Sequence, residues 1–169
     1  APRRFGCGRP RYETRSAAET AALGERVGRL LRNGDVVGLS GALGAGKTSF
    51  VRGLARGLAL DPDVVYSPSF TLVAEYPGPL TLHHIDLYRL GEPVSLAEAE
   101  EIGLREYLDP AGVTAIEWSR KLEEAREVFS LSIDIEIGDA ERRVVRIEAG
   151  NERGEEILRS LVRDRPAAE

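Results

Sequence analysis

Hydrophobic and polar residues follow each other with two different periods along this chain. Apolar residues recur every three to four positions in three segments: residues 16–34, 48–58 and 153–164. A one-sided apolar stripe of this kind is typical of a helix that packs on a core. Short apolar or alternating runs predict strands at residues 12–16, 35–40, 71–76, 80–90, 112–118, 129–137 and 142–149.

Local signals place the boundaries of these elements. Two capping boxes, Ser16-Ala-Ala-Glu19 and Ser95-Leu-Ala-Glu98, each predict a helix start, and the second begins helical turns that reach Tyr107. Gly34 is expected to end the first helix, and Gly138-Asp139 predicts a hairpin turn. Helices and strands come early and mostly strands follow. This order predicts an α/β domain with a mixed, mostly parallel central sheet that is flanked by helices and has an antiparallel edge.

Length and charge narrow the picture. The 169 residues suit one domain, expected over residues 13–165 after a basic, disordered tail at residues 1–12. A net charge of −5 argues against a general nucleic-acid binder, although residues 1–15 hold five arginines and one glutamate, a charge of 5 − 1 = +4. A basic segment like this can touch RNA or an acidic partner, or it can simply be solvated.

Cellular setting follows from what the composition lacks. Cys7 is the single cysteine, which fits a reducing compartment. No apolar run approaches the roughly 18 residues that a membrane span needs. The arginines near the first residue have no apolar stretch behind them, so no secretory signal is expected. We therefore expect a cytoplasmic protein.

The run GALGAGKT at residues 41–48 is the strongest chemical motif. Gly41, Gly46, Lys47 and Thr48 fit the phosphate-loop pattern G-x-x-x-x-G-K-[ST], between an apolar strand and an amphipathic helix. Glycines let backbone N–H groups approach phosphate oxygens, and the following helix adds its positive end. The pattern predicts a P-loop NTPase-like fold in which a nucleotide is held by the loop and the residue after it: Gly41, Ala42, Leu43, Gly44, Ala45, Gly46, Lys47, Thr48 and Ser49.

Two residues of this motif have predicted charge and metal roles. Lys47 is expected to supply an exposed, mobile positive charge to the β- and γ-phosphates, and Thr48 a hydroxyl ligand to Mg²⁺. The chain has 21 arginines and only two lysines, Lys47 and Lys121. A sequence that so prefers arginine still has lysine at position 47, where a compact ammonium group fits and a planar guanidinium does not.

Acidic residues at strand ends are candidates for the catalytic side of the site. Glu117 ends the apolar run VTAIE in a Walker-B pattern, and Asp86 ends the alternating run LHHID. Because active crevices lie at the carboxyl ends of parallel strands, both are predicted to act beside the metal and the attacking water. Either acid can equally be an ordinary solvated residue at a strand end.

Other polar residues near these acids have competing interpretations. His83 and His84 are neighbours on one strand, so they face opposite ways and cannot form one metal pair; one is expected in the core and one at the surface. The segment SPSFTLV at 67–73 can be a switch loop or a plain strand entry. Trp118 follows Glu117 and is interpreted as either a core plug or a partly exposed anchor for nucleotide or partner.

Missing motifs exclude several phosphate-loop classes. The guanine-reading N-K-x-D segment and the transporter signature L-S-G-G-Q are absent, and the chain is short for a helicase. No lid pattern supports a small-molecule kinase, although that reading stays open, as does an ATP-gated adaptor without turnover. No arginine finger is evident in the sequence, so an ATPase of this kind is expected to be slow until a partner completes its site.

Five motifs in order, GALGAGKTSFVRGLARGL, SPSFTLV, HHIDLYRL, EIGLREYL and IEWS, resemble the TsaE (YjeE) family. The resemblance covers about residues 16–150 and implies a cytosolic Mg²⁺-dependent ATPase that acts with TsaB and TsaD in forming threonylcarbamoyladenosine in tRNA, at the adenosine next to the anticodon. It implies phosphate and Mg²⁺ roles for Lys47 and Thr48, the Mg²⁺-side carboxylate at Glu117, a second active-site acid at Asp86, and the family tryptophan at Trp118. Ser119 departs from the family, which usually has proline there.

Overall fold

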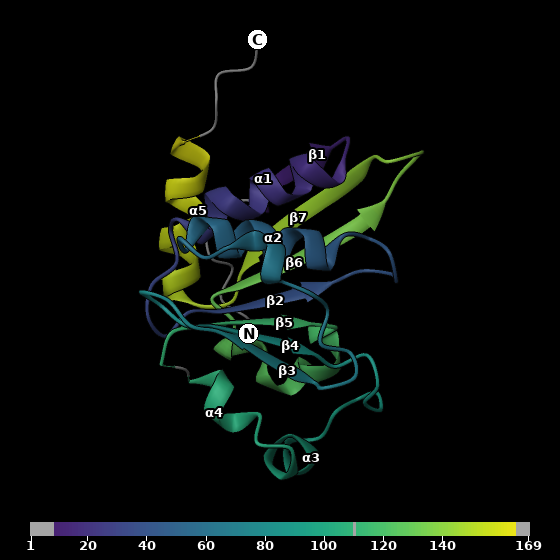
Figure 1. The fold of residues 1–169 in the computed structure, drawn as a ribbon, viewed down its shortest axis with the longest axis vertical. Helices are drawn as coiled ribbons and strands as arrows, with labels where there is room; N and C mark the ends of the chain where they lie inside the picture. Colours follow the sequence, from purple (N-terminus) through teal and green to yellow (C-terminus); the bar gives the residue numbers. More distant parts are fainter. Residues whose placement is uncertain (1–8, 110, 165–169) are drawn as a thin grey trace.

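The computed structural model describes residues 9–109 and 111–164 as a single sheet with helices on both faces (Figure 1). The described elements follow one another along the chain as β1 (Arg11–Thr14), α1 (Ala17–Gly28), β2 (Val36–Ser40), α2 (Lys47–Gly57), η1 (Pro62–Val64), β3 (Val73–Tyr76), β4 (Leu82–Asp86), α3 (Leu96–Glu101), α4 (Arg105–Leu108), β5 (Val113–Glu117), η2 (Ser119–Val128), β6 (Leu131–Ile137), β7 (Arg143–Ala149) and α5 (Glu152–Arg163).

The sheet has seven strands in the order β1-β7-β6-β2-β5-β4-β3. Its centre is parallel, because β2 pairs in parallel with both β5 and β6, and β4 pairs in parallel with β5. Strands β7 and β1 extend one side in antiparallel fashion, and β3 does the same on the other side. The predicted fold class is confirmed, with antiparallel strands at both edges rather than one.

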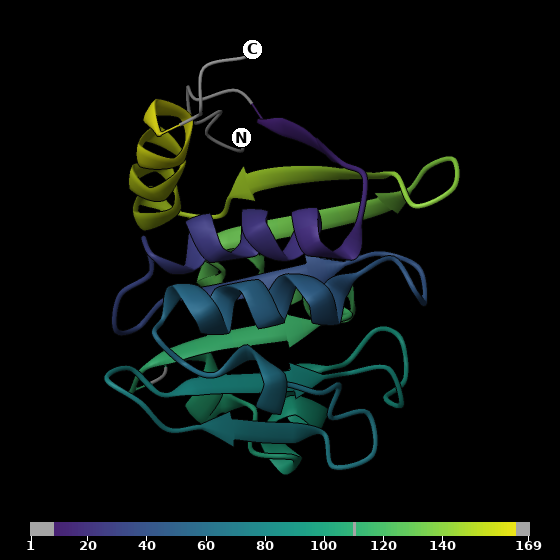
Figure 2. The same ribbon diagram turned by 45° about the horizontal axis from the view of Figure 1, so that its top comes forward.

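Two apolar cores lie on the two faces of this sheet. The larger core joins α1, α2 and α5 to the sheet through residues such as Val27, Phe50 and Ile157. The smaller core joins α3 and η2 to the opposite face through Ala99, Leu122 and Ile116. Figure 2 shows α1 and α2 lying side by side across one face of the strands. Strands buried on both faces explain why β2 and β5 read as continuous apolar runs.

Glycines allow α1 and α2 to touch along their backbones. A Cβ atom added at Gly24 would overlap Phe50 O, and one added at Gly53 would overlap Ala21 O. The same close approach recurs one helical turn further on. A Cβ atom added at Gly28 would lie 2.5 Å from Leu54 O, and one added at Gly57 would lie 2.5 Å from Glu25 O. The middle and last turns of α2 are therefore held against α1 without intervening side chains.

Several boundaries differ from those expected. Helix α1 ends at Gly28 rather than at Gly34, because residues 29–34 turn back so that Gly34 N can donate to Gly112 O beside the sheet. Strand β4 stops at Asp86 because its neighbour β5 stops at Glu117 and no longer offers a ladder. The turns after Ser95 form two short helices, α3 and α4.

The first strand begins inside the segment expected to be a tail. Strand β1 starts at Arg11 and pairs with β7 through Arg146 to Arg143. Residues 1–8, which hold Arg3, Arg4 and Cys7, lie outside the described residues, as do residues 165–169. None of the described helices is long and apolar enough to cross a membrane.

Candidate functional site

The phosphate loop joins the end of β2 to the start of α2. Three of its glycines have positive φ: Gly41 at 149°, Gly44 at 78° and Gly46 at 108°. Residues with a side chain rarely adopt these angles, which explains glycine here. A side chain on Gly41 would also overlap Ile135 O of β6, whereas nothing lies within 4 Å of an added Cβ on Gly44. The loop is thus packed at its base and open at its tip.

Lys47, the first residue of α2, points back across this loop. Its Nζ donates to Gly41 O at 2.7 Å and to Ala42 O at 2.9 Å, and it lies 4.2 Å from the ring centroid of Trp118. Only 5% of the residue is exposed, so the expectation of an exposed lysine is wrong. Burial lowers the pKa of Lys47, and the negative charges of Glu117 and Asp86 partly oppose that shift.

Thr48 is joined directly to Glu117. Thr48 Oγ1 donates to Glu117 Oε1 at 2.8 Å, and His84 Nε2 lies 3.0 Å from the same oxygen. Glu117 ends β5 and is 3% exposed. Because β5 and β2 are parallel neighbours, the end of β5 lies beside the loop that leaves β2. One buried carboxylate therefore faces the phosphate-loop hydroxyl.

Asp86 occupies the matching position on the next strand. It is the register partner of Glu117 in the β4–β5 ladder and is 2% exposed. Ser67 Oγ donates to its Oδ2 at 2.6 Å, and the backbone N–H of Tyr88 donates to its Oδ1 at 2.8 Å. Ser67 comes from the SPSFTLV segment, so this segment is tied to the acid at the strand end.

Trp118 turns the chain away from the sheet immediately after Glu117. Its backbone is left-handed, with φ 62° and ψ 36°, and it precedes η2. Its ring lies 5.2 Å from the ring of Tyr88 and 5.8 Å from Lys121 Nζ. Lys121 in turn donates to Tyr88 O and Leu90 O. Both lysines of the chain therefore lie against its one tryptophan.

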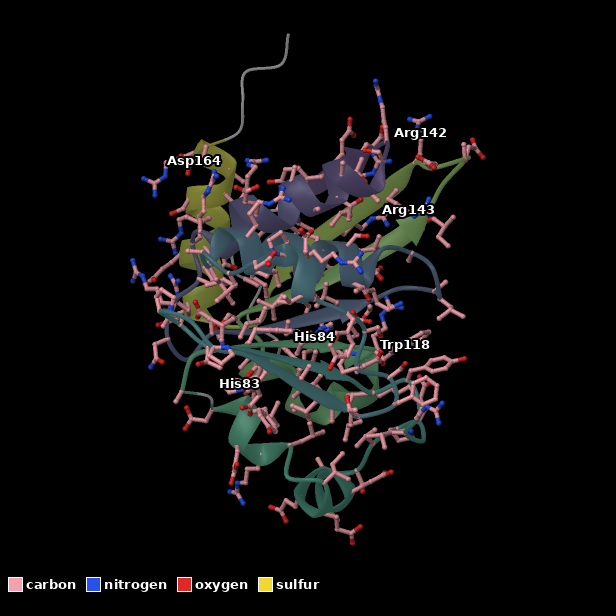
Figure 3. The ribbon with its side chains drawn as sticks, in the orientation of Figure 1. His83, His84, Trp118, Arg142, Arg143 and Asp164 are labelled. Atoms are coloured by element: carbon pink, nitrogen blue, oxygen red, sulfur yellow. The ribbon has the colours of Figure 1, made fainter. Side chains whose placement is uncertain are left out.

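Arg143 binds backbone carbonyls of the phosphate loop. It is the first residue of β7, and Figure 3 shows it at the same end of the sheet as Trp118. Its guanidinium donates to Ala45 O at 3.0 Å, and to Arg142 O in the hairpin at 2.9 Å. A longer contact of 3.4 Å reaches Gly44 O. The neighbouring Arg142 pairs instead with Glu13 of β1.

These elements enclose a cavity of about 360 Å³ at the carboxyl ends of β2, β4 and β5. Its lining comes from the phosphate loop, the SPSFTLV segment and the two strand ends: Leu43, Gly44, Gly46, Lys47, Thr48, Ser49, Ser67, Ser69, Asp86, Tyr88, Glu117 and Trp118. The open loop tip and the first turn of α2 offer backbone N–H groups to an anion. A lysine, a hydroxyl and two carboxylates in one such cavity fit a nucleotide phosphate together with a divalent cation.

A second cavity of about 470 Å³ is larger but lacks this chemistry. It lies beside η2 and is lined by four arginines, Arg9, Arg120, Arg126 and Arg146, among other residues. Acids already pair with all four of them, as Arg9–Glu148, Arg126–Glu148, Arg120–Asp134 and Arg146–Glu136. Because it has no glycine loop and its charges largely balance, we place the phosphate site in the smaller cavity.

Comparison with known proteins adds a family to this geometry. A family model described as threonylcarbamoyl adenosine biosynthesis protein TsaE matches residues 14–145. The chain belongs to the TsaE family. The resemblance predicted from five sequence motifs is thereby confirmed. The match contains every residue that lines the phosphate-loop cavity, and it also reaches Arg143.

Individual TsaE relatives and a solved structure agree with the family match. A protein named tRNA threonylcarbamoyladenosine biosynthesis protein TsaE from Treponema pallidum is 45% identical over 127 residues, which are 75% of this chain and 91% of that protein. The protein of the same name from Bacillus subtilis is 38% identical over 143 residues, 83% of this chain and 87% of that one. The crystal structure of Bacillus subtilis YdiB matches with a TM-score of 0.76 at 32% identity, covering 92% of this chain and 95% of the other.

In this TsaE-family fold, the residues predicted from sequence gather at one place. Asp86, Glu117, Lys47, Thr48 and Trp118 line one cavity, as do Leu43, Gly44, Gly46 and Ser49. Gly41 and Ala42 contribute the carbonyls that hold Lys47, and Ala45 is fully buried beneath the loop. Trp118 is half-buried: it lines the cavity and also packs against the smaller core, and its role as an anchor for nucleotide or partner stays a prediction.

Four residues near the site carry contacts that the sequence did not reveal. His84 reaches Glu117, Lys121 fixes the loop after β4, Ser67 holds Asp86, and Arg143 supports the phosphate loop. The histidine expectation was half right, because His84 is fully buried while the side chain of His83 is only 13% exposed. The scarcity of lysine was a usable signal for Lys121; no sequence pattern pointed to Arg143.

Proposed function

We propose that this TsaE-family chain binds Mg·ATP in the phosphate-loop cavity and hydrolyses it in support of threonylcarbamoyladenosine formation in tRNA, at the adenosine next to the anticodon. The observation that carries the proposal is the 2.8 Å hydrogen bond between Thr48 Oγ1 and Glu117 Oε1. It brings a phosphate-loop hydroxyl and a strand-end carboxylate within reach of one cation. The names of the relatives support the pathway.

Binding is assigned to the loop and to Lys47. The backbone N–H groups of the loop and of the first turn of α2 receive the phosphate oxygens. Lys47 Nζ is held by two neutral carbonyls, Gly41 O and Ala42 O. A charged phosphate oxygen is a stronger acceptor than a carbonyl, so the ammonium group can exchange these partners for the β- and γ-phosphates.

Hydrolysis is assigned to the two acids beside the loop. Thr48 and Glu117 would hold Mg²⁺, which when bound neutralises the charge that develops on the phosphates. No group of three or more His, Cys, Asp or Glu side chains among the described residues could hold a metal unaided. That fits Mg²⁺, which usually takes one or two protein carboxylates and keeps phosphate and water ligands. Glu117 or Asp86 orients the water that attacks the γ-phosphate, while Lys47 stabilises the leaving phosphate oxygens.

A partner protein is part of the proposal. Arginines are plentiful in this chain, yet none of the described ones lines the phosphate-loop cavity. Arg143 lies behind the loop, where its guanidinium is occupied by backbone carbonyls. We infer that the chain hydrolyses ATP slowly by itself in the cytoplasm and that TsaB and TsaD, through which it is linked to tRNA, change its rate.

The test measures ATP hydrolysis by the purified protein under three conditions: alone, with candidate acceptor metabolites, and with TsaB and TsaD from the same source. Slow turnover that changes with TsaB and TsaD is expected. ATP consumption that depends on a metabolite would replace the proposal with a small-molecule kinase. Tight ATP binding without turnover in any mixture would replace it with a nucleotide-gated adaptor. Glu117→Gln serves as the inactive control throughout.

A further inference from the structure

A fully buried histidine touches the carboxylate at the centre of the site. We propose that His84 is a positioning residue for Glu117: its imidazole donates from Nε2 to Oε1 and so aims the other carboxylate oxygen into the cavity. The contact itself is independent of the reaction. Its effect on turnover rests on the ATPase function proposed above.

The geometry fixes the carboxylate from two directions. His84 lies on β4 and Glu117 on the neighbouring β5, and their side chains meet at 3.0 Å. Thr48 Oγ1 donates to the same Oε1 at 2.8 Å from α2. Both described contacts use this one oxygen, and no described residue is found to donate to Oε2. Two donors on one oxygen restrict rotation of the carboxylate and leave the other oxygen available to the cavity.

The position of the imidazole proton follows from the other ring nitrogen. His84 is 0% exposed, and its Nδ1 is buried without a hydrogen-bond partner in the described part of the chain. A proton on Nδ1 would be a buried donor without an acceptor, which is costly. A proton on Nε2 meets the Glu117 carboxylate, which can only accept when ionised. The structure therefore assigns the Nε2–H tautomer, with a bare Nδ1.

The adjacent histidine shows what a purely structural contact looks like in the same strand. His83 points to the other face of β4, where its Nε2 lies 3.0 Å from Ala111 O and its ring lies 5.2 Å from the ring of Tyr107. Its Nδ1 faces Glu75, an exposed acid on the edge strand β3. None of these three partners of His83 lines the phosphate-loop cavity. It is therefore a matched control for His84.

The first test reads the tautomer without any nucleotide. The chain has two histidines, so a ¹⁵N–¹H correlation spectrum of the labelled full-length protein shows two imidazoles, and His83→Gln identifies which is which. For His84 we expect a proton on Nε2 and none on Nδ1, together with a shift of the Nε2 signal in Glu117→Ala that exceeds any shift at His83. A proton on Nδ1, or a His84 signal that ignores Glu117→Ala, would overturn the inference.

The second test separates turnover from binding. In His84→Phe we expect kcat for ATP to fall about 10- to 100-fold, the usual cost of losing a group that orients a ligand, while the Kd for Mg·ATP stays within about threefold. His84→Gln, which restores an N–H donor, should recover much of the loss, and His83→Phe should leave kcat unchanged. Equal loss of rate and affinity, or no recovery in a folded His84→Gln, would contradict positioning. If wild-type protein hydrolyses no ATP under any condition, the proposed function fails while the spectrum still decides the contact.

Discussion

Two acids are equally buried at opposite ends of neighbouring parallel strands, and they have different partners. Asp35 lies just before β2 and Glu117 ends β5, and each is 3% exposed. Arg153 of α5 contacts both oxygens of Asp35, and Ser130 Oγ and the Arg32 backbone N–H complete its partners. Within residues 9–109 and 111–164, Glu117 receives a hydroxyl and an imidazole, both on one oxygen, and no other side-chain donor.

The difference separates Asp35, whose charge is used within the fold, from Glu117, whose charge can act on a ligand in the cavity. A buried carboxylate is tolerated when a cation and further hydrogen bonds offset its lost hydration. For Asp35 that cation is a permanent arginine, which also donates to Leu30 O and so ties α5 to the turn after α1. No arginine in the described part of the chain pairs with Glu117, and its carboxylate lines a cavity instead. Burial alone thus does not distinguish the two acids; the permanent cation partner of Asp35 does.

The largest expected effect is on the structural side of this comparison. Arg153→Ala leaves Asp35 buried without a cation, and we expect a loss of about 3–5 kcal/mol in the free energy of unfolding. Urea unfolding measures it, with the exposed Arg159→Ala on the same helix as the control. A loss as small as that of Arg159→Ala would show that Asp35 does not depend on its guanidinium.

The opposite pattern is expected at the functional acid. Glu117→Gln keeps the shape of the side chain but removes its charge, so ATP turnover should fall at least about 100-fold while stability changes by less than about 1 kcal/mol. Asp86→Asn should also keep much of the nucleotide affinity and lose turnover. Parallel rate and unfolding measurements check both variants, with Glu136→Gln at the exposed end of β6 as the control. Wild-type turnover in both variants would move the catalytic crevice elsewhere.

A smaller effect is expected when the cation opposite the acids is removed. Lys47→Ala deletes the charge that the phosphates would meet, and one charge-assisted hydrogen bond is worth about 1.5–3 kcal/mol, so ATP affinity should fall at least about tenfold. Calorimetry measures the affinity. Lys121→Ala removes the other lysine, which holds loop carbonyls rather than facing the phosphate loop, and should weaken binding less. Unchanged affinity in Lys47→Ala would reject the phosphate-loop assignment.

The smallest effect is optical. Trp118 is the only tryptophan, and Lys47 Nζ lies 4.2 Å from its ring. If Mg·ATP draws the ammonium group toward the phosphates, the emission of Trp118 should shift on titration, and Lys47→Ala should abolish most of that shift. An emission spectrum that no ligand moves, together with a Trp118→Ala variant that mainly loses thermal stability, would make this residue part of the core only.

The sequence predicted features that depend on consecutive residues, and it did not predict contacts between residues far apart in the chain. The glycine loop needs eight consecutive residues, and an acid at the end of an apolar run needs five, so both were found. The His84–Glu117 contact joins residues 33 positions apart, the Arg143 contact with Ala45 spans 98, and the Arg153 contact with Asp35 spans 118. These three contacts depend on strand order and register, which cannot be read from the periodicity of hydrophobic residues along the chain. For the same reason the pairing of β1 with β7 was not predicted.

The glycine contact between α1 and α2 has a mechanical consequence for the nucleotide site. Helix α2 begins with Lys47 and Thr48, and the tight backbone contacts at Gly24, Gly53 and Gly57 leave it no room to slide or roll against α1. Helix α2 is therefore fixed against α1 along its middle and last turns, and its N-terminal end carries Lys47 and Thr48. If the proposed turnover involves movement, we expect it in the segments opposite that end, the SPSFTLV loop and the loop after β4. A methyl group added at Gly53 would collide with Ala21 O and should displace Lys47 and Thr48 without contacting them.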